Sequence, residues 1–304
     1  MKKPLALYLL IASLLFTFIA CKDPPKSTLD QFKASIESGH ELPAGLPEKY
    51  IEDPTIPERV REARKSVIGV TVVIKLNQDI PSLTSRRELV SRGSGFFIES
   101  DIGPDIVISA RHVLIDPILD MNRKVGLPFA LDNGIPKSEH YSYYLYGTNY
   151  TTRPPENFYL QPVSIGTFGE HQDYMALRVY GYDRKIKPLT LRSDVKLGDQ
   201  VFISGYVPIF SFYPNSLGGY EKVQSNVISK IFKGKLSKII DDLPINKVGS
   251  IAQYEIEINC EFGYSGGPVL NSEGEVIGMT IEKLSNFVQA VSAKDIIHFA
   301  ASTK

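Results

Sequence analysis

Short apolar runs rich in β-branched and aromatic residues recur along most of this chain, and they restrict its possible folds more than any other feature. Gly, Pro, Asn and Asp bound these runs, which include SVIGVTVVIKL, GSGFFIES, DIVISARHVL, DYMALRVYGY, DQVFISGYVP, YEIEINC, EGEVIGMTIEK and NFVQAVSA. Many short strands with little long helical periodicity predict an all-β barrel or sandwich. The last segment, KDIIHFAAS, predicts a closing C-terminal helix.

The first 21 residues differ from the rest of the chain. Lys2 and Lys3 precede an uncharged apolar run from Leu5 to Ala20, and Cys21 follows it. This run is shorter than the roughly 20 residues that span a bilayer as a helix, but it suits the core of a signal peptide. Its closing FIAC resembles a bacterial lipoprotein signal, which implies a lipid on Cys21. The folded part would then lie in the bacterial cell envelope, lipid-anchored and facing the periplasm or the exterior. A plain secretory signal or an uncleaved anchor is the alternative.

Two further segments stand apart from the strand pattern. Residues 22–64 are dense in proline and charge, which predicts a semi-rigid spacer, and Leu29, Phe32 and Ile36 fall at the spacing of a short amphipathic helix. The folded domain is then expected over residues 65–304. Within it, the stretch 122–159 shows few strand features and is rich in tyrosine, notably over 141–159. We interpret it as an insertion, either a recognition surface or a packed loop.

Composition excludes several classes of function. Lys and Arg together number 34, as do Asp and Glu, so nothing predicts a nucleic-acid partner. There is no P-loop or dinucleotide-binding glycine motif, and the two cysteines and five histidines lack zinc-ligand spacing. We therefore expect no metal and no cofactor. Cys260 would have only a lipid-modified partner in Cys21, so no internal disulfide is expected.

The segment GYSGGP, which contains Ser265, has the composition of a nucleophile loop. A serine hydroxyl needs a neighbouring base before it can attack a carbonyl. It also needs backbone N–H groups directed at the oxyanion that forms, and glycines let the backbone fold tightly enough to present them. Composition alone leaves a simple turn between strands as the alternative.

This segment resembles the G-x-S-G-G-P signature of the chymotrypsin-like serine peptidases. SARH resembles the family's T-A-A-H motif, and DYMALRV resembles its D-x-A-x-L strand. The resemblance implies His112 as the general base, Asp173 as its partner and Ser265 as the nucleophile. The amides of Gly263 and Ser265 would form the oxyanion hole. The implied fold is two antiparallel six-stranded β-barrels, at about 65–187 and 188–304.

The resemblance also implies details of specificity and activation. It is strongest to bacterial trypsin-like and Deg-type peptidases, and no PDZ segment is expected before the chain stops at Lys304. Asn259 would lie at the base of the specificity pocket, where a neutral side chain favours apolar or small substrate residues. Tyr264 occupies the position at which relatives activated by cleavage carry an acid. We therefore expect no such activation step.

Two functions follow from these observations. The first is a membrane-tethered, extracytoplasmic serine endopeptidase that acts on proteins or peptides. The second is a lipoprotein that binds peptides or proteins on a peptidase fold without turnover, because fold alone does not establish function. The natural substrate, the oligomeric state and the membrane that holds the lipid stay open.

Overall fold

The computed structural model describes residues 53–76, 88–100, 105–125, 130–132, 135–137, 140–152, 155–166, 172–182, 186–214, 220–240, 253–258, 260 and 263–302. Cys21, Asn259 and the helix expected through Leu29, Phe32 and Ile36 lie outside these residues.

Six antiparallel strands close the first barrel. They are β1 (Val67–Leu76), β2 (Glu88–Ile98), β3 (Ile106–Ser109), β6 (Tyr141–Asn149), β7 (Glu156–Ile165) and β8 (Met175–Tyr180), in the order β1-β2-β3-β8-β7-β6. Their apolar side chains fill the barrel, and Phe96, Ile108 and Leu145 are fully or almost fully buried. A separate two-stranded sheet consists of β4 (Ala130–Asp132) and β5 (Ile135–Lys137).

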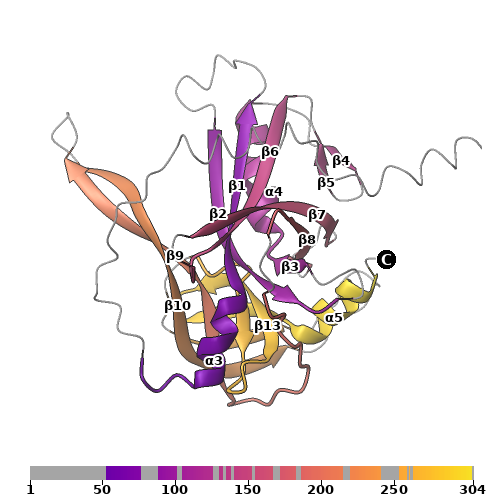
Figure 1. The fold of residues 1–304 in the computed structure, drawn as a ribbon, viewed down its shortest axis with the longest axis vertical. Coiled ribbons are helices and arrows are strands. Elements are labelled where there is room, and N and C mark those ends of the chain that lie inside the picture. The colour runs from indigo at the N-terminus through magenta and orange to yellow at the C-terminus, as the bar shows by residue number, and fades with distance from the viewer. Residues whose placement is uncertain are drawn as a thin grey trace, which may run out of the picture. The chain divides into compact units, whose positions relative to one another are not determined.

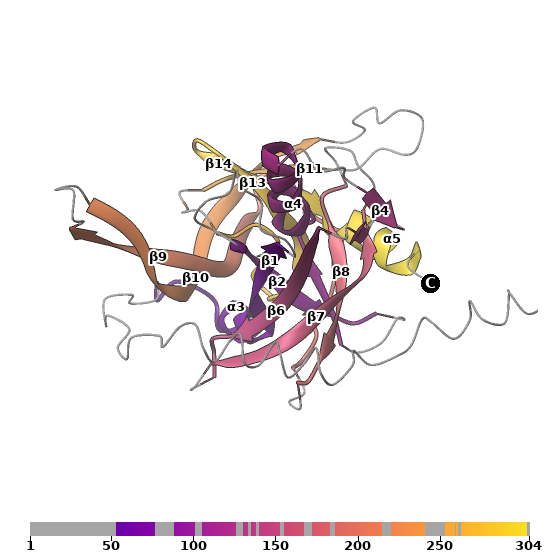
Figure 2. The same cartoon turned by 90° about the horizontal axis from the view of Figure 1, so that it is seen from above.

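Six further strands close the second barrel. They are β9 (Gln200–Pro214), β10 (Tyr220–Ile240), β11 (Gln253–Glu257), β12 (Pro268–Leu270), β13 (Val276–Leu284) and β14 (Phe287–Ser292), in the order β10-β11-β14-β13-β12-β9. The outer part of the β9–β10 hairpin extends away from this barrel (Figures 1 and 2). The predicted pair of six-stranded antiparallel barrels is therefore confirmed.

Helices lie at both ends of the described part of the chain. The predicted C-terminal helix is α5 (Ala293–Ser302). Before the first strand, α3 (Glu58–Ala63) and the short η1 (Arg64–Ser66) bury Val60 and Ala63. Arg59 forms an ion pair with Glu273, in the turn between β12 and β13. The packed part of the chain therefore begins before residue 65. Within the described residues, no helix is long and apolar enough to cross a membrane.

The structure corrects two of our interpretations. The run DIVISARHVL is not one strand, because β3 ends at Ser109 and helix α4 (His112–Val125) begins at His112. The tyrosine-rich stretch is not an insertion. It contains β6 and the start of β7, both of which are strands of the first barrel. Tyr146 pairs with Tyr159, and Tyr159 pairs with Tyr180 across neighbouring strands.

Candidate active site

The end of β3 and the start of β8 bring His112 and Asp173 together. These strands are neighbours, and Ser109 pairs with Met175. His112 therefore follows the end of one strand, at the first residue of α4, while Asp173 precedes the start of the next. The backbone N–H of His112 donates to Asp173 Oδ1 at 2.8 Å, and His112 Nδ1 contacts Asp173 Oδ2. This carboxylate, only 8% exposed, fixes both the backbone and the ring of the histidine.

Charge around the ring sets the protonation of His112. Burial lowers the pKa of this imidazole, but three effects act in the opposite direction: the hydrogen bond to Asp173, the charge of Asp173 and the charge of Asp116. Arg111 lowers the pKa, and the net result is a pKa above the ordinary value of 6.5. Asp116 lies one turn along α4 from His112, so both acids stabilise the imidazolium that forms when the ring takes a proton.

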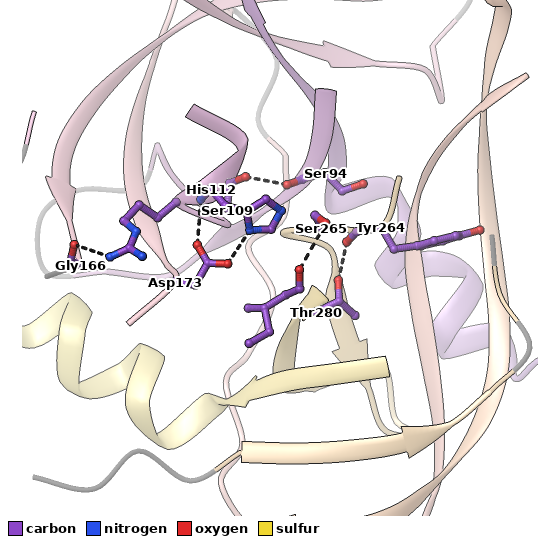
Figure 3. Close-up of polar contacts among 10 residues, drawn as sticks. Ser94, Ser109, His112, Gly166, Asp173, Tyr264, Ser265 and Thr280 are labelled. Carbon is purple, nitrogen blue, oxygen red and sulfur yellow. Dashed lines mark hydrogen bonds and ion pairs between the residues drawn. The ribbon is translucent and has the colours of Figure 1, made fainter. Parts of the chain in front are cut away.

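Ser265 approaches this pair from the second barrel. It lies in the loop that leads into β12, and its carbonyl accepts a hydrogen bond of 2.7 Å from the backbone N–H of Ser94 in β2. In Figure 3 the imidazole of His112 lies between the carboxylate of Asp173 and the side chain of Ser265. The Ser265 hydroxyl itself donates to the carbonyl of Ile281 at a distance of 3.4 Å. The structure thus brings together the three side chains that the sequence predicted.

Two glycines allow the tight path of this loop. Gly263 has a φ of 115° and Gly266 a φ of 83°, values that other residues rarely adopt. A Cβ atom at Gly266 would also lie 2.2 Å from the Ser94 carbonyl oxygen and 2.6 Å from Ser109 Oγ. The loop therefore packs directly against β2 and the end of β3, and no side chain fits between them.

The amides of Gly263 and Ser265 have no acceptor among the described residues. The neighbouring amides do have acceptors: Gly266 donates to the Thr280 carbonyl at 2.8 Å, and Gly267 donates to the Tyr264 carbonyl at 2.7 Å. Unsatisfied backbone N–H groups next to a serine are suited to hold a developing oxyanion.

Ser94 joins the two barrels behind the nucleophile loop. Its hydroxyl donates to the Gly263 carbonyl at 3.1 Å and accepts the N–H of Tyr206, in β9, at 2.9 Å. Its carbonyl accepts the hydroxyl of Ser109 at 2.7 Å. The sequence analysis placed this residue in the strand GSGFFIES without giving it a role. The only signal available was a polar residue between glycines in an apolar strand.

Tyr264 packs into the second barrel instead of facing the site. Its side chain is 4% exposed and makes an edge-to-face contact with Phe232, with ring centroids 5.1 Å apart. A Cβ atom at Gly205 would lie 2.8 Å from the Tyr264 ring, so the ring crosses β9 where that strand lacks a side chain. An apolar environment of this kind suits a neutral residue and disfavours a carboxylate.

No group of three or more potential metal ligands is present among the residues that the structure describes. Arg111, next to His112, places a guanidinium nitrogen 3.5 Å from the Gly166 carbonyl, just before the segment that leads to Asp173 (Figure 3). The arrangement of Ser265, His112 and Asp173 can carry out nucleophilic attack and proton transfer by side chains.

Comparison with known proteins found similar solved structures and one matching family. Among solved structures, the active form of the Rv3671c protease from M. tuberculosis is similar over 84% of this chain and 93% of its own, with 17% identity and a TM-score of 0.48. The HtrA-type protease AlgW with a decapeptide is similar over 81% of this chain and 66% of its own, with 14% identity and a TM-score of 0.48. No curated protein matches. A model of the trypsin-like peptidase domain matches residues 93–279. Because this match spans more than half of the sequence, the chain belongs to the trypsin-like peptidase domain family.

Proposed function

We propose that this protein is a serine endopeptidase that hydrolyses peptide bonds through Ser265, His112 and Asp173. The observation that carries the proposal is the alignment of these side chains. Asp173 holds both the backbone N–H and Nδ1 of His112, which leaves the opposite nitrogen of the ring toward Ser265 (Figure 3). Membership of the trypsin-like peptidase family supports the same reaction.

The reaction follows from this geometry in two stages. Ser265 Oγ attacks the substrate carbonyl while His112 Nε2 takes its proton, and Asp173 stabilises the imidazolium. The amides of Gly263 and Ser265 hold the oxyanion. His112 then gives the proton to the leaving amine, so the C–N bond breaks and an acyl-enzyme remains. A water molecule, deprotonated by His112, then attacks the ester. His112 gives this proton to Ser265 Oγ as the bond between Oγ and the acyl carbon breaks, and the carboxylic acid product leaves.

One observation favours the alternative of a protein that binds peptides without turnover. The Ser265 hydroxyl donates to the Ile281 carbonyl and not to His112. Hydrogen bonds of a catalytic site are often long or misaligned before substrate binds, and a contact of 3.4 Å is weak. This weak contact therefore does not outweigh the alignment of the three side chains.

A fluorophosphonate probe tests the proposal, because it phosphonylates only activated serines, with loss of fluoride. The full-length protein in detergent should label at one site, and Ser265→Ala should abolish the labelling. His112→Ala should do the same without loss of the fold, as judged by circular dichroism. A folded wild-type protein that does not label would refute the peptidase and support the binding protein.

We also propose that a lipid on Cys21 tethers the domain in the cell envelope, and that the specificity pocket accepts apolar or small residues next to Asn259. Expression of the wild type and Cys21→Ala with an alkyne-labelled palmitate tests the tether. The label and the membrane fraction should both be lost in the variant. A peptide library cut by the purified protein tests the pocket, and cleavage mainly after Lys or Arg would contradict it.

A further inference from the structure

We infer that Thr280 is a positioning residue whose hydroxyl directs the Ser265 amide into the oxyanion hole. This inference rests on the proposed function. Thr280 lies in β13, its side chain is 1% exposed, and it does not reach the reacting atoms. Its hydroxyl contacts the Tyr264 carbonyl, which belongs to the peptide that carries the Ser265 amide (Figure 3).

The contacts of Thr280 show which peptide its hydroxyl controls. Thr280 Oγ1 makes a short hydrogen bond to the Tyr264 carbonyl and lies 3.2 Å from the Gly267 carbonyl. A hydroxyl has one proton to donate, and the Tyr264 carbonyl is the closer acceptor. The same carbonyl also accepts the Gly267 N–H at 2.7 Å, so two donors hold it, one from β13 and one from the nucleophile loop.

Peptide geometry turns this contact into an orientation of the Ser265 amide. In a planar trans peptide, the C=O and the following N–H point in opposite directions. With the Tyr264 carbonyl held toward Thr280, the N–H of Ser265 must point away from β13. The Ser265 amide has no acceptor among the described residues, as a donor to an oxyanion requires. A rotation of this one peptide would remove the donor from the oxyanion hole.

The hydroxyl is not needed to hold the strand itself. The backbone of Thr280 already pairs with the loop, because its N–H donates to the Gly267 carbonyl at 2.9 Å and its carbonyl accepts the Gly266 N–H at 2.8 Å. Valine has the same shape as threonine and an equal preference for strands. The hydroxyl of a buried threonine at this position therefore acts on the Tyr264 carbonyl and not on the pairing of β13.

Three variants of the full-length protein in detergent isolate this effect. Thr280→Val removes the hydroxyl and keeps the shape, while Thr280→Ser keeps the hydroxyl. Thr148→Val is the matched control, because Thr148 is also buried in a strand, and its hydroxyl donates to Asn157 at 2.7 Å. The readouts are the rate of fluorophosphonate labelling and the hydrogen exchange of the Gly267 amide, whose acceptor is the Tyr264 carbonyl.

The inference predicts a specific pattern. Labelling of Thr280→Val should be slower by about 10- to 100-fold, somewhat less than the loss seen when an oxyanion donor is removed outright. Labelling of Thr280→Ser and Thr148→Val should stay within about threefold of the wild type. The Gly267 amide should exchange faster only in Thr280→Val. Labelling of Thr280→Val at the wild-type rate would overturn the inference, as would equal slowing in Thr148→Val.

The two readouts also separate this inference from the proposed function. A wild-type protein that fails to label refutes the peptidase, and the exchange of the Gly267 amide then decides the inference alone. Unchanged protection of this amide in Thr280→Val would show that the hydroxyl does not hold the peptide. Lost protection, restored in Thr280→Ser, would show that it does.

Discussion

The hydroxyl of Ser94 should contribute more to stability than any exposed serine in this chain. Its side chain is fully buried and joins a carbonyl of the nucleophile loop to an N–H of β9. Ser94→Ala leaves both of these backbone groups without that partner, at a cost of about 1–3 kcal/mol for each. We expect a loss of about 2–6 kcal/mol in the free energy of unfolding. For a domain of this size, this loss lowers the melting temperature by roughly 4–24 °C.

Urea denaturation of the full-length protein in detergent, followed by tyrosine fluorescence, measures this loss. Ser237→Ala is the matched control, since this exposed hydroxyl donates to the Glu255 carbonyl at 2.9 Å, and its removal should cost less than about 0.5 kcal/mol. Both variants lose one hydroxyl oxygen. A large difference between their losses in the free energy of unfolding therefore measures the effect of burying Ser94 and of its contacts between the two barrels. A loss below about 1 kcal/mol in Ser94→Ala would refute the reasoning.

Three further predictions follow from the site and its surroundings. The pKa of His112 lies above 6.5, and its ring must be neutral to act as a base, so the labelling rate should fall as the pH drops through this raised pKa. Asp116→Asn removes one of the charges that raise the pKa of His112, so the labelling rate of this variant should fall at a lower pH. An unshifted profile in Asp116→Asn would show that this charge does not reach the ring. Gly266→Ala should lower the free energy of unfolding, measured in urea, by about 3–5 kcal/mol, because the new Cβ clashes with the Ser94 carbonyl and the backbone has a positive φ. Gly181→Ala is the control, with a φ of 74° and nothing within 4 Å of a Cβ, and it should cost only about 1–2 kcal/mol. Equal losses in the two variants would contradict this. A chain that begins at residue 65 should melt lower than one that begins at residue 53, since only the longer chain contains α3, and equal melting temperatures would show that this helix adds nothing.

Local patterns predicted many short strands in a barrel or a sandwich, and the resemblance to the chymotrypsin-like peptidases implied the two barrels and the positions of the candidate site. Alternating β-branched residues mark most strands. GYSGGP, SARH and DYMALRV are short motifs, and their order along the chain is enough to identify the residues of the candidate site. These motifs predicted His112, Asp173 and Ser265, which the structure brings together. Their catalytic roles, the lipid on Cys21 and the pocket at Asn259 remain proposals.

Other features depend on contacts between distant segments, and the sequence did not show them. Helix α4 was missed because its first residues continue an apolar run and Pro117 argues against a helix. Burial of Leu114 and Ile118 on one face favours the helix all the same. Strand β6 was missed because its tyrosines suggested a surface loop. The contact of Ser94 with Gly263 joins residues 169 positions apart, and that of Thr280 with Tyr264 joins residues 16 positions apart. No local sequence pattern predicts either contact.

The packing of α3 limits how far the proposed peptidase can act from a membrane. Helix α3 packs against the turn after β12, where a Cβ atom at Gly274 would lie 2.5 Å from the Arg59 carbonyl oxygen, and this turn is close in sequence to the nucleophile loop. Arg59 follows Cys21 by 38 positions, and a fully extended chain of that length spans at most about 140 Å. With a lipid on Cys21, Arg59 would lie within that distance of the bilayer, and Ser265 would work within it plus the width of the folded domain. Substrates would have to lie in the same envelope layer or enter it, so attachment itself would select them before any pocket does.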